Sequence, residues 1–292
     1  MNEYLMSVLL GIVEGLTEFL PVSSTAHLRI TEALMKIPLD DPYWKMYTIV
    51  IQLGAILALC LLFLGRIVEF IRTFPKGETG ERNWWNHPIS LTLIAFAFTS
   101  APALLLHKWS EKNLGSLNAM AWALLLGGIV MWIIDAWSVR HEAITLDVEQ
   151  MSLPQAIWIG LCQTLSAVFP GTSRSMSTIA AGQLVGLSRP AALEFSFLLS
   201  IPTMFAATIW DLLKELHPSK AALAAGIATH VEMTSTRWVV LLIGAVVSFI
   251  VALGVVEWFL FWVRRHGLVM FALYRILLGG ALLLFGAKYI VG

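Results

Sequence analysis

Two glutamates lie four residues apart in the first apolar segment of the chain, within VEGLTEFL. Residues with this spacing share one face of a helix, so the carboxylates of Glu14 and Glu18 point the same way. Acids inside apolar membrane segments are costly, and they usually line a cavity, pair with a cation or mark a pathway. We interpret the pair as ligands of a hard divalent cation, Mg²⁺ or Ca²⁺, that also binds substrate oxygens. The alternative is a pair at headgroup level that faces water.

Hydroxyl side chains and a histidine follow the acids in the run PVSSTAH. Ser and Thr are preferred N-cap residues, so one of Ser23, Ser24 and Thr25 is expected to cap a helix that begins here. Capping does not account for His27. If Ser24 lies at or near the cap, His27 lies one turn further on and can take the proton of its hydroxyl, as in covalent catalysis. The run therefore predicts Ser24 as nucleophile and His27 as base, and direct attack by a His27-activated water is the close variant.

The second half of the chain contains PGTSRSMST, in which one arginine lies among hydroxyl side chains. A helix N-terminus with free N–H groups, hydroxyl donors and a guanidinium is a phosphate-binding arrangement. Arg174 is therefore predicted to bind a phosphoryl group, unless it forms a structural salt bridge with Glu14 or Glu18. Both interpretations bring the two runs into contact. The predicted substrate-binding residues are Ser23, Thr25, Gly171, Thr172, Ser173, Ser175 and Thr178.

The composition indicates that these runs are held by membrane helices. Hydrophobic residues make up 58% of the 292 residues, charged residues only 13%, and the mean hydropathy is +0.78. Six apolar runs are near the length of about 20 residues with which a helix crosses a bilayer. They are Met46–Gly65, Pro88–Leu106, Asn113–Ile134, Phe195–Trp210, Trp238–Val256 and Gly267–Tyr289. The expected fold is an all-α integral membrane protein that crosses the membrane several times.

Two further apolar segments, Tyr4–Met35 and Pro154–Leu187, are interrupted by Pro, Ser and charged residues, and they contain the two chemical runs. Proline disfavours a continuous helix, so each segment is predicted to fold as helix, break, helix and to return to the face from which it entered. We expect two re-entrant helix hairpins.

The two halves of the chain resemble each other. Glu14–Thr25 aligns with Gln163–Arg174, and Trp122–Gly128 aligns with Tyr274–Gly280 at nearly the same offset, although short apolar strings also match by chance. Such matches suggest an internal duplication, with residues 1–140 and 150–292 as two repeats of one membrane domain covering 1–292. Each repeat would hold one re-entrant hairpin and three spans. Because an odd number of spans inverts the second repeat, both hairpins would meet at a midplane site.

Charge excludes one class of partner. Nineteen basic and nineteen acidic residues cancel, and no basic block marks a nucleic-acid surface. Two charged residues in or beside the spans, Glu194 and Arg275, are expected to pair with each other or to face water. The basic residues divide evenly between the two membrane faces, so charge alone gives no orientation.

The runs EGLTEFLPVSSTAH and PGTSRSMST together resemble the bacterial undecaprenyl-diphosphate phosphatase family, also called bacitracin-resistance protein BacA. The resemblance extends to Ile51–Leu57, Gly186–Pro202 and the pair Tyr274–Arg275, so it covers nearly the whole chain. Ala26 and Met176 stand where the family usually has glycine, and neither change removes a chemical group. Carried over by position, the family's functional residues are Glu14, Glu18, His27, Ser173, Arg174 and Thr178, with Ser24 as the proposed nucleophile.

What the resemblance implies is hydrolysis of the terminal phosphate of undecaprenyl diphosphate, which returns the carrier lipid to peptidoglycan synthesis. It also implies a bacterial inner-membrane location, with the site open to the periplasmic face. The predicted partners are the polyprenyl diphosphate lipid, the bilayer and, as an option that the sequence leaves open, a second copy in a homodimer. The competing class is a transporter or flippase of the lipid phosphate, because inverted repeats with broken helices are also typical of carriers.

Overall fold

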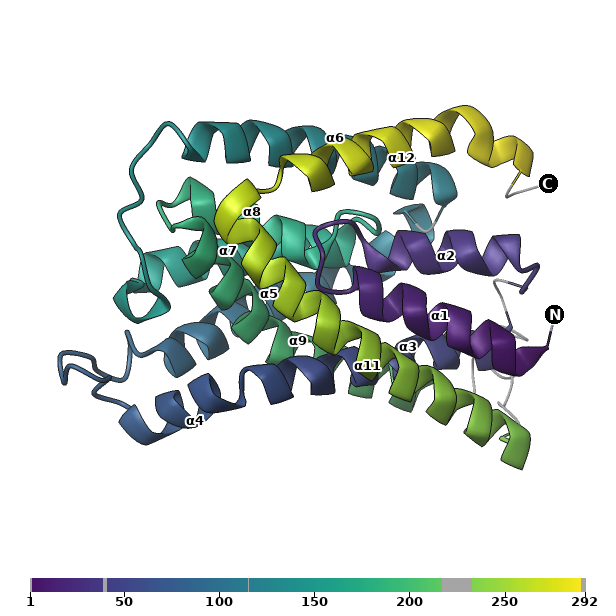
Figure 1. The fold of residues 1–292 in the computed structure, drawn as a ribbon, viewed down its shortest axis with the longest axis horizontal. Helices are drawn as coiled ribbons and strands as arrows, with labels where there is room; N and C mark the ends of the chain where they lie inside the picture. The colour runs from purple at the N-terminus through teal and green to yellow at the C-terminus, as the bar shows by residue number, and fades with distance from the viewer. Residues whose placement is uncertain (1, 39–40, 115, 217–232, 290–292) are drawn as a thin grey trace.

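The structure is a computed structural model that describes residues 2–38, 41–114, 116–216 and 233–289. Six helices of this part of the chain are long and apolar enough to cross a membrane, as the sequence predicted (Figure 1). They are α3 (Pro42–Leu62), α5 (Pro88–Leu114), α6 (Leu117–Ser138), α9 (Arg189–Leu216), α11 (Ser235–His266) and α12 (Val269–Tyr289). The chain is therefore a multi-pass, all-helical membrane protein.

Helix ends differ from the ends of the uncharged runs. The run Asn113–Ile134 contains the junction of α5 and α6, where the Ser116 hydroxyl accepts a hydrogen bond from the N–H of Ala119 and caps α6. Helix α11 continues past Val256 and ends only at Gly267, whose φ of 69° breaks the helix. Hydropathy predicts the part of a helix that contacts lipid, whereas caps set where the helix begins and ends.

Four shorter helices form two pairs. The first pair is α1 (Glu3–Thr17) and α2 (Ser24–Leu34), joined by residues 18–23, which we call the first turn. The second pair is α7 (Leu153–Val168) and α8 (Arg174–Leu184), joined by residues 169–173, the second turn. The two pairs approach the middle of the molecule from opposite ends (Figure 1). Two further elements complete the described chain: helix α4 (Leu64–Thr73), which follows α3, and a 3₁₀ turn (Val148–Gln150), which precedes α7.

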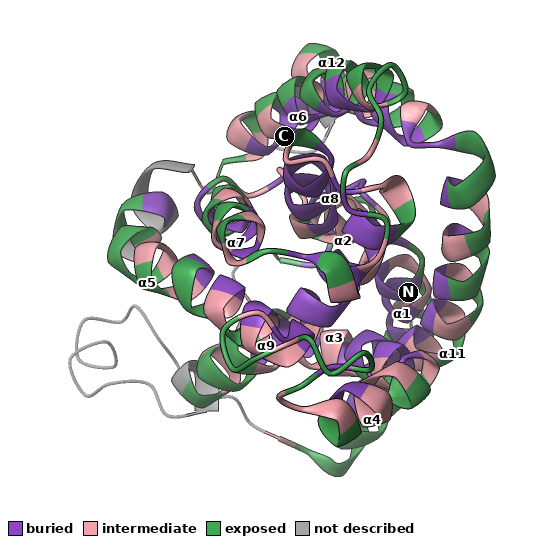
Figure 2. Cartoon of the chain, turned by 90° about the vertical axis from the view of Figure 1, so that its left-hand side faces the viewer, coloured by how far each residue is buried: buried purple, intermediate pink, exposed green. Residues whose placement is uncertain are grey.

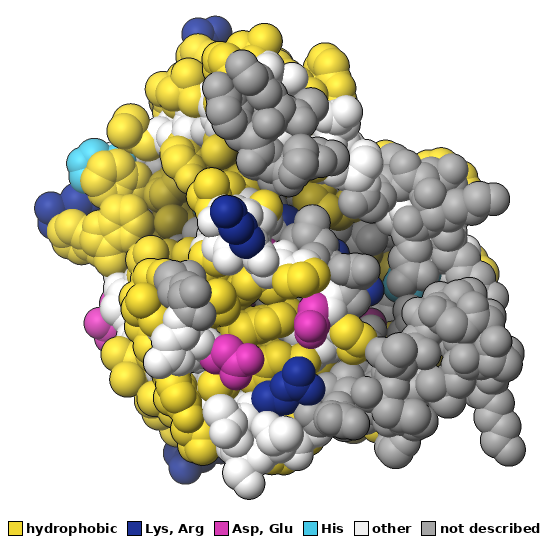
Figure 3. All heavy atoms as spheres, turned by 90° about the vertical axis from the view of Figure 1, so that its right-hand side faces the viewer, with side chains coloured by type: hydrophobic (Ala, Val, Ile, Leu, Met, Phe, Trp, Pro, Cys, Tyr) yellow, Lys and Arg dark blue, Asp and Glu magenta, His cyan; other side chains and the backbone are white. Residues whose placement is uncertain are grey.

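The core surrounds α8. Every residue of α8 from Ser175 to Gln183 is buried, and Figure 2 shows α2 and α8 in the middle of the helices when the molecule is seen end-on. Leucines on the outer faces of the long helices are exposed, among them Leu105, Leu242 and Leu277. An exposed apolar surface of this extent is expected where lipid covers a protein. Charged side chains of both signs appear on the end of the molecule drawn in Figure 3.

Small residues let the helices approach closely. A Cβ placed on Gly54 would lie 2.1 Å from the carbonyl oxygen of Ala245, and one on Gly244 would lie 1.9 Å from the Tyr47 hydroxyl. Tyr47 is fully buried, and its hydroxyl is hydrogen-bonded to the carbonyl and hydroxyl of Ser7 at 2.9 Å, so the ring has no room to move aside. Membrane helices commonly pack through small residues of this kind.

We expect Gly244→Ala to destabilise the protein by about 1–3 kcal/mol, because the new methyl group overpacks α11 against α3. Gly254→Ala is the matched control on the same helix, since a Cβ there meets nothing within 4 Å. Replacing an open helical glycine by alanine is expected to stabilise by up to about 1 kcal/mol. Thermal unfolding in detergent measures both, and equal melting temperatures for the two variants would contradict the packing described here.

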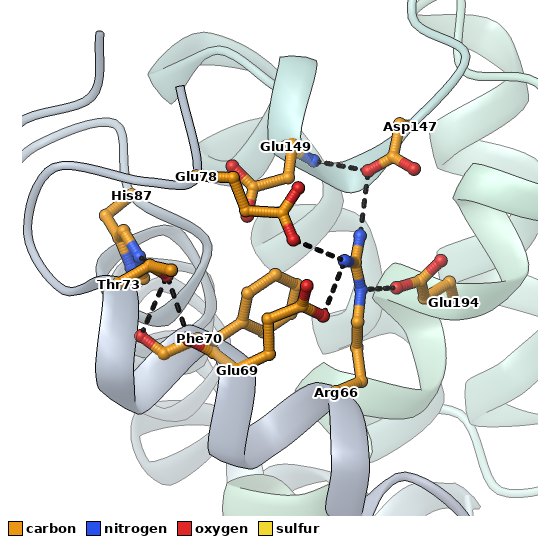
Figure 4. Close-up of polar contacts among 9 residues, drawn as sticks. All are labelled: Arg66, Glu69, Phe70, Thr73, Glu78, His87, Asp147, Glu149 and Glu194. Atoms are coloured by element: carbon orange, nitrogen blue, oxygen red, sulfur yellow. Dashed lines mark hydrogen bonds and ion pairs between the residues drawn. The ribbon is translucent and has the colours of Figure 1, made fainter. Parts of the chain in front are cut away.

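Arg66 ties α4 to the second half of the chain (Figure 4). Its guanidinium donates to Glu69 at 2.9 Å, to Asp147 at 3.0 Å and to Glu194 at 2.9 Å. A hydrogen bond between Glu78 and Glu69 lowers the pKa of Glu69 and raises the pKa of Glu78. Glu78 therefore holds a proton more readily than Glu69 does. The predicted mutual pairing of Glu194 with Arg275 is wrong, because Arg66 is the partner of Glu194.

Candidate active site

The two turns meet at Glu18. The Ser24 hydroxyl donates to Oε2 of Glu18 at 2.5 Å, and Nη2 of Arg174 donates to Oε1 of the same carboxylate at 2.9 Å. Only 13% of the Arg174 side chain and 9% of the Glu18 side chain are exposed. Ser24 and Arg174 are the first residues of α2 and α8. The starts of these two helices are therefore both bound to Glu18, which directly follows α1. The sequence suggested a salt bridge of Arg174 with either Glu14 or Glu18, and in the structure the partner is Glu18.

The caps of α2 and α8 explain this geometry. Ser23 caps α2 by accepting from the N–H of Ala26, and Ser173 caps α8 by accepting from the N–H of Met176. Both serines have positive φ, 74° for Ser23 and 72° for Ser173, which is uncommon outside glycine and is concentrated at functional sites. Because Ser23 takes the cap, the Ser24 hydroxyl stays available for Glu18.

His27 is held by two groups other than Ser24. Its Nδ1 lies 2.7 Å from the carbonyl oxygen of Ser23, and its Nε2 lies 2.6 Å from the Tyr274 hydroxyl. Since a carbonyl oxygen only accepts, Nδ1 carries the proton and Nε2 accepts from Tyr274. The expected hydrogen bond between Ser24 and His27 is therefore replaced by two others, and the nearest proton acceptor of Ser24 is Glu18.

Glu14 is fully buried beside Glu18, and no N–H or O–H donor of the other described residues is hydrogen-bonded to either of its carboxylate oxygens. Nη1 of Arg174 has no hydrogen-bond partner among the described residues. Buried polar atoms are costly unless they are paired, so this arrangement suits a cation at Glu14 and an anionic oxygen at Arg174.

The donor set also fits the predicted cation. In the described part of the chain no three His, Cys, Asp or Glu side chains gather in a group that could hold a metal ion. Among the described residues, the carboxylates of Glu14 and Glu18 are the candidate ligands. Mg²⁺ is commonly bound through one or two carboxylates together with water and substrate phosphates, so the residues present fit this ion.

The other predicted substrate-binding residues divide into three groups. Ser175 donates to the Glu18 carbonyl at 3.5 Å, and Thr178 shares a hydrogen bond of 2.6 Å with Ser196, so both fasten α8 to its neighbours. Thr25 is exposed and Thr172 is partly exposed. Gly171 has a φ of 98°, and a Cβ there would lie 2.7 Å from the carbonyl oxygen of Met120, so this turn requires glycine.

Three residues of this region were missed or misread in the sequence. Arg275 was visible as the charge in the middle of the last apolar run, but its partners were not, since they are backbone carbonyls. Tyr274, the partner of His27, stood out in the repeat match and in the resemblance, but nothing in the sequence paired it with His27. Ser196, the partner of Thr178, carries no signal in the sequence, because a single hydroxyl in an apolar helix is common.

Comparison with known proteins identifies the family of the chain. The sequence matches the family of the bacitracin resistance protein BacA over residues 7–281. The chain belongs to this family. A relative from Koribacter versatilis, named undecaprenyl-diphosphatase, is 60% identical over 289 residues, which cover 99% of this chain and all of the relative. A protein of the same name from Caldanaerobacter subterraneus subsp. tengcongensis is 40% identical over 292 residues, covering 100% of this chain and 99% of its own.

A third BacA relative from Aquifex aeolicus, again named undecaprenyl-diphosphatase, is 40% identical over 274 residues, or 94% of each chain. These alignments span 94% or more of each protein. The predicted membership of the BacA family is confirmed.

Proposed function

We propose that this chain is an undecaprenyl-diphosphate phosphatase, which releases the terminal phosphate of undecaprenyl diphosphate and returns undecaprenyl phosphate to peptidoglycan synthesis. The observation that carries the proposal is the meeting of Ser24 and Arg174 at Glu18, because it places a hydroxyl nucleophile beside a phosphate-binding cation. The names of the relatives agree with it. The enzyme would lie in the bacterial inner membrane, with its site open to the periplasmic face.

We also propose that the two helix pairs are re-entrant hairpins of an inverted repeat. Packing supports this, because α1 packs on α11 while α7 packs on α5, and α6 packs on α12. The two serine caps with positive φ lie at corresponding positions, Ser23 before α2 and Ser173 before α8. The boundaries of the repeats, residues 1–140 and 150–292, and assembly as a homodimer remain predictions.

In the proposed reaction Ser24 Oγ attacks the terminal phosphorus, and its proton passes to the carboxylate of Glu18, which accepts its hydrogen bond. The bond from that phosphorus to the bridging oxygen breaks, and undecaprenyl phosphate leaves. Water then attacks the phosphorus of phosphoserine 24 and the bond from that phosphorus to Oγ breaks. Oγ takes its proton back from Glu18, and inorganic phosphate is released. His27, predicted as the base, would serve the attacking water once its contact with Tyr274 opens.

The remaining residues act by position and charge. Arg174 binds the phosphoryl oxygens through the free Nη1, while its Nη2 is held by Glu18. Glu14 and Glu18 would hold the Mg²⁺ or Ca²⁺ ion, which when bound neutralises the charge of the diphosphate. Phosphoryl transfer depends chiefly on positioning and electrostatic stabilisation, so a site with these few groups is sufficient.

The test is release of inorganic phosphate from undecaprenyl diphosphate by the purified protein in detergent, where no second compartment exists for transport. We expect turnover by the wild type and a loss of about 100-fold or more in Arg174→Lys, because a point charge does not replace a planar guanidinium on a phosphoryl group. Arg265→Lys, at the end of α11, is the matched control and should remain active. Lipid movement in vesicles without phosphate release would instead identify a transporter.

A further inference from the structure

Arg275 on α12 is fully buried, and the hydrogen bonds of its guanidinium go to backbone carbonyls. Its Nη1 donates to Pro21 at 3.1 Å, and its Nη2 donates to Ala123 at 3.1 Å and to Gly171 at 3.2 Å. Pro21 lies in the first turn, Gly171 in the second turn and Ala123 in α6. One side chain therefore connects both turns of the candidate active site.

A buried cation of this kind needs a reason, because charged side chains within membrane segments are costly. The described residues include no carboxylate that is hydrogen-bonded to Arg275, and its Nε has no partner among them. Packing alone does not call for an arginine. The planar guanidinium is suited to this place because it donates in several fixed directions at once, which an ammonium group on a flexible stem does less well.

Helix α6 is shaped to receive the guanidinium. A Cβ on Gly127 would lie 2.5 Å from Nη2 of Arg275 and 2.7 Å from the terminal methyl of Met176. Any larger residue at Gly127 would therefore push the guanidinium away from its acceptors. Met176 belongs to α8, so the space beside Gly127 that holds the guanidinium also borders α8, the helix that begins with Arg174.

We propose that Arg275 is a positioning residue, which holds the first and second turns at the separation at which Ser24 and Arg174 both reach Glu18. Ser24 follows Pro21 by three residues, as Arg174 follows Gly171, so a shift of either carbonyl moves one of the two groups bound to Glu18. This inference rests on the proposed phosphatase function.

The experiment compares Arg275→Lys and Gly127→Ala with the wild type in purified, full-length protein. Arg275→Lys keeps the positive charge but loses the planar guanidinium. Gly127→Ala keeps Arg275 but places a methyl group in the space that its guanidinium occupies. We expect each to lower kcat by roughly 100-fold, since a misplacement of about 1 Å can have that effect on an oriented reaction. Gly280→Ala is the control on α12, because a Cβ there meets nothing within 4 Å, and it should keep wild-type kcat.

Hydrogen–deuterium exchange supplies a measurement that does not depend on turnover. If Arg275 holds the turns, peptides covering residues 18–24 and 169–174 should exchange faster in both variants, while α3, α9 and α11 keep their protection. Wild-type kcat in Arg275→Lys would overturn the proposal, as would faster exchange spread evenly over all helices. If Arg275→Lys does not fold, Gly127→Ala decides by the same two measurements. If the wild type releases no phosphate, the phosphatase proposal fails, and the exchange data alone still test whether Arg275 holds the turns.

Discussion

Replacing Ser24 by alanine is expected to lower kcat by about 1,000-fold or more while substrate binding is kept, because the lost group acts mainly in the transition state. The hydroxyl is the one that Glu18 orients, at 2.5 Å, beside Arg174. The measurement is single-turnover phosphate release, together with a rapid-quench search for phosphorylated Ser24 in the wild type.

Ser23→Ala is the matched control, since it removes a neighbouring hydroxyl that caps α2 instead of binding Glu18. It is expected to lower stability by about 1 kcal/mol and to reduce turnover far less. Near wild-type turnover by Ser24→Ala would show that the covalent route is wrong. A water molecule activated by His27 would then be the preferred nucleophile.

Glu14→Gln is expected to lower activity by about 100-fold or more and to remove the response to divalent cations, because the amide keeps the shape of the side chain but not its charge. In the wild type, added Mg²⁺ should raise the melting temperature, since a ligand that binds only the folded protein stabilises it. Glu14→Gln should lose that shift. No N–H or O–H donor of the other described residues is bonded to either oxygen of Glu14, so the variant removes no such hydrogen bond.

Glu32→Gln is the control for this experiment, because Glu32 is also a buried acid of the first helix pair, 5% exposed, but has no proposed role in the reaction. It should keep both the turnover and the Mg²⁺ shift. Full activity of the wild type after exhaustive chelation would refute the cation proposal, whatever the effect of Glu14→Gln on turnover.

The sequence by itself determined the class of protein and most of its elements. Apolar runs of about 20 residues have few alternatives to membrane helices, since every backbone polar group in a bilayer must be bonded internally. The interruptions at Pro21 and Pro170 predicted the two short helix pairs, because proline next to Ser and charged residues disfavours a continuous helix. Proline alone does not end a helix, since Pro102 and Pro202 lie inside α5 and α9. Acids, hydroxyls and an arginine in such breaks were enough to indicate a phosphate site.

Only the tertiary structure decided which groups face one another. Local spacing favoured Ser24 with His27, three residues apart. Instead, the Ser24 hydroxyl donates to Glu18 across the first turn, and His27 contacts Tyr274 on the distant helix α12. Similarly, Arg275 and Glu194 were matched by charge, whereas Arg275 binds carbonyls of both turns and Glu194 binds Arg66. Spacing along the chain fixes neighbours within one helix, and contacts between helices depend on packing, capping and backbone carbonyls, which residue types do not reveal.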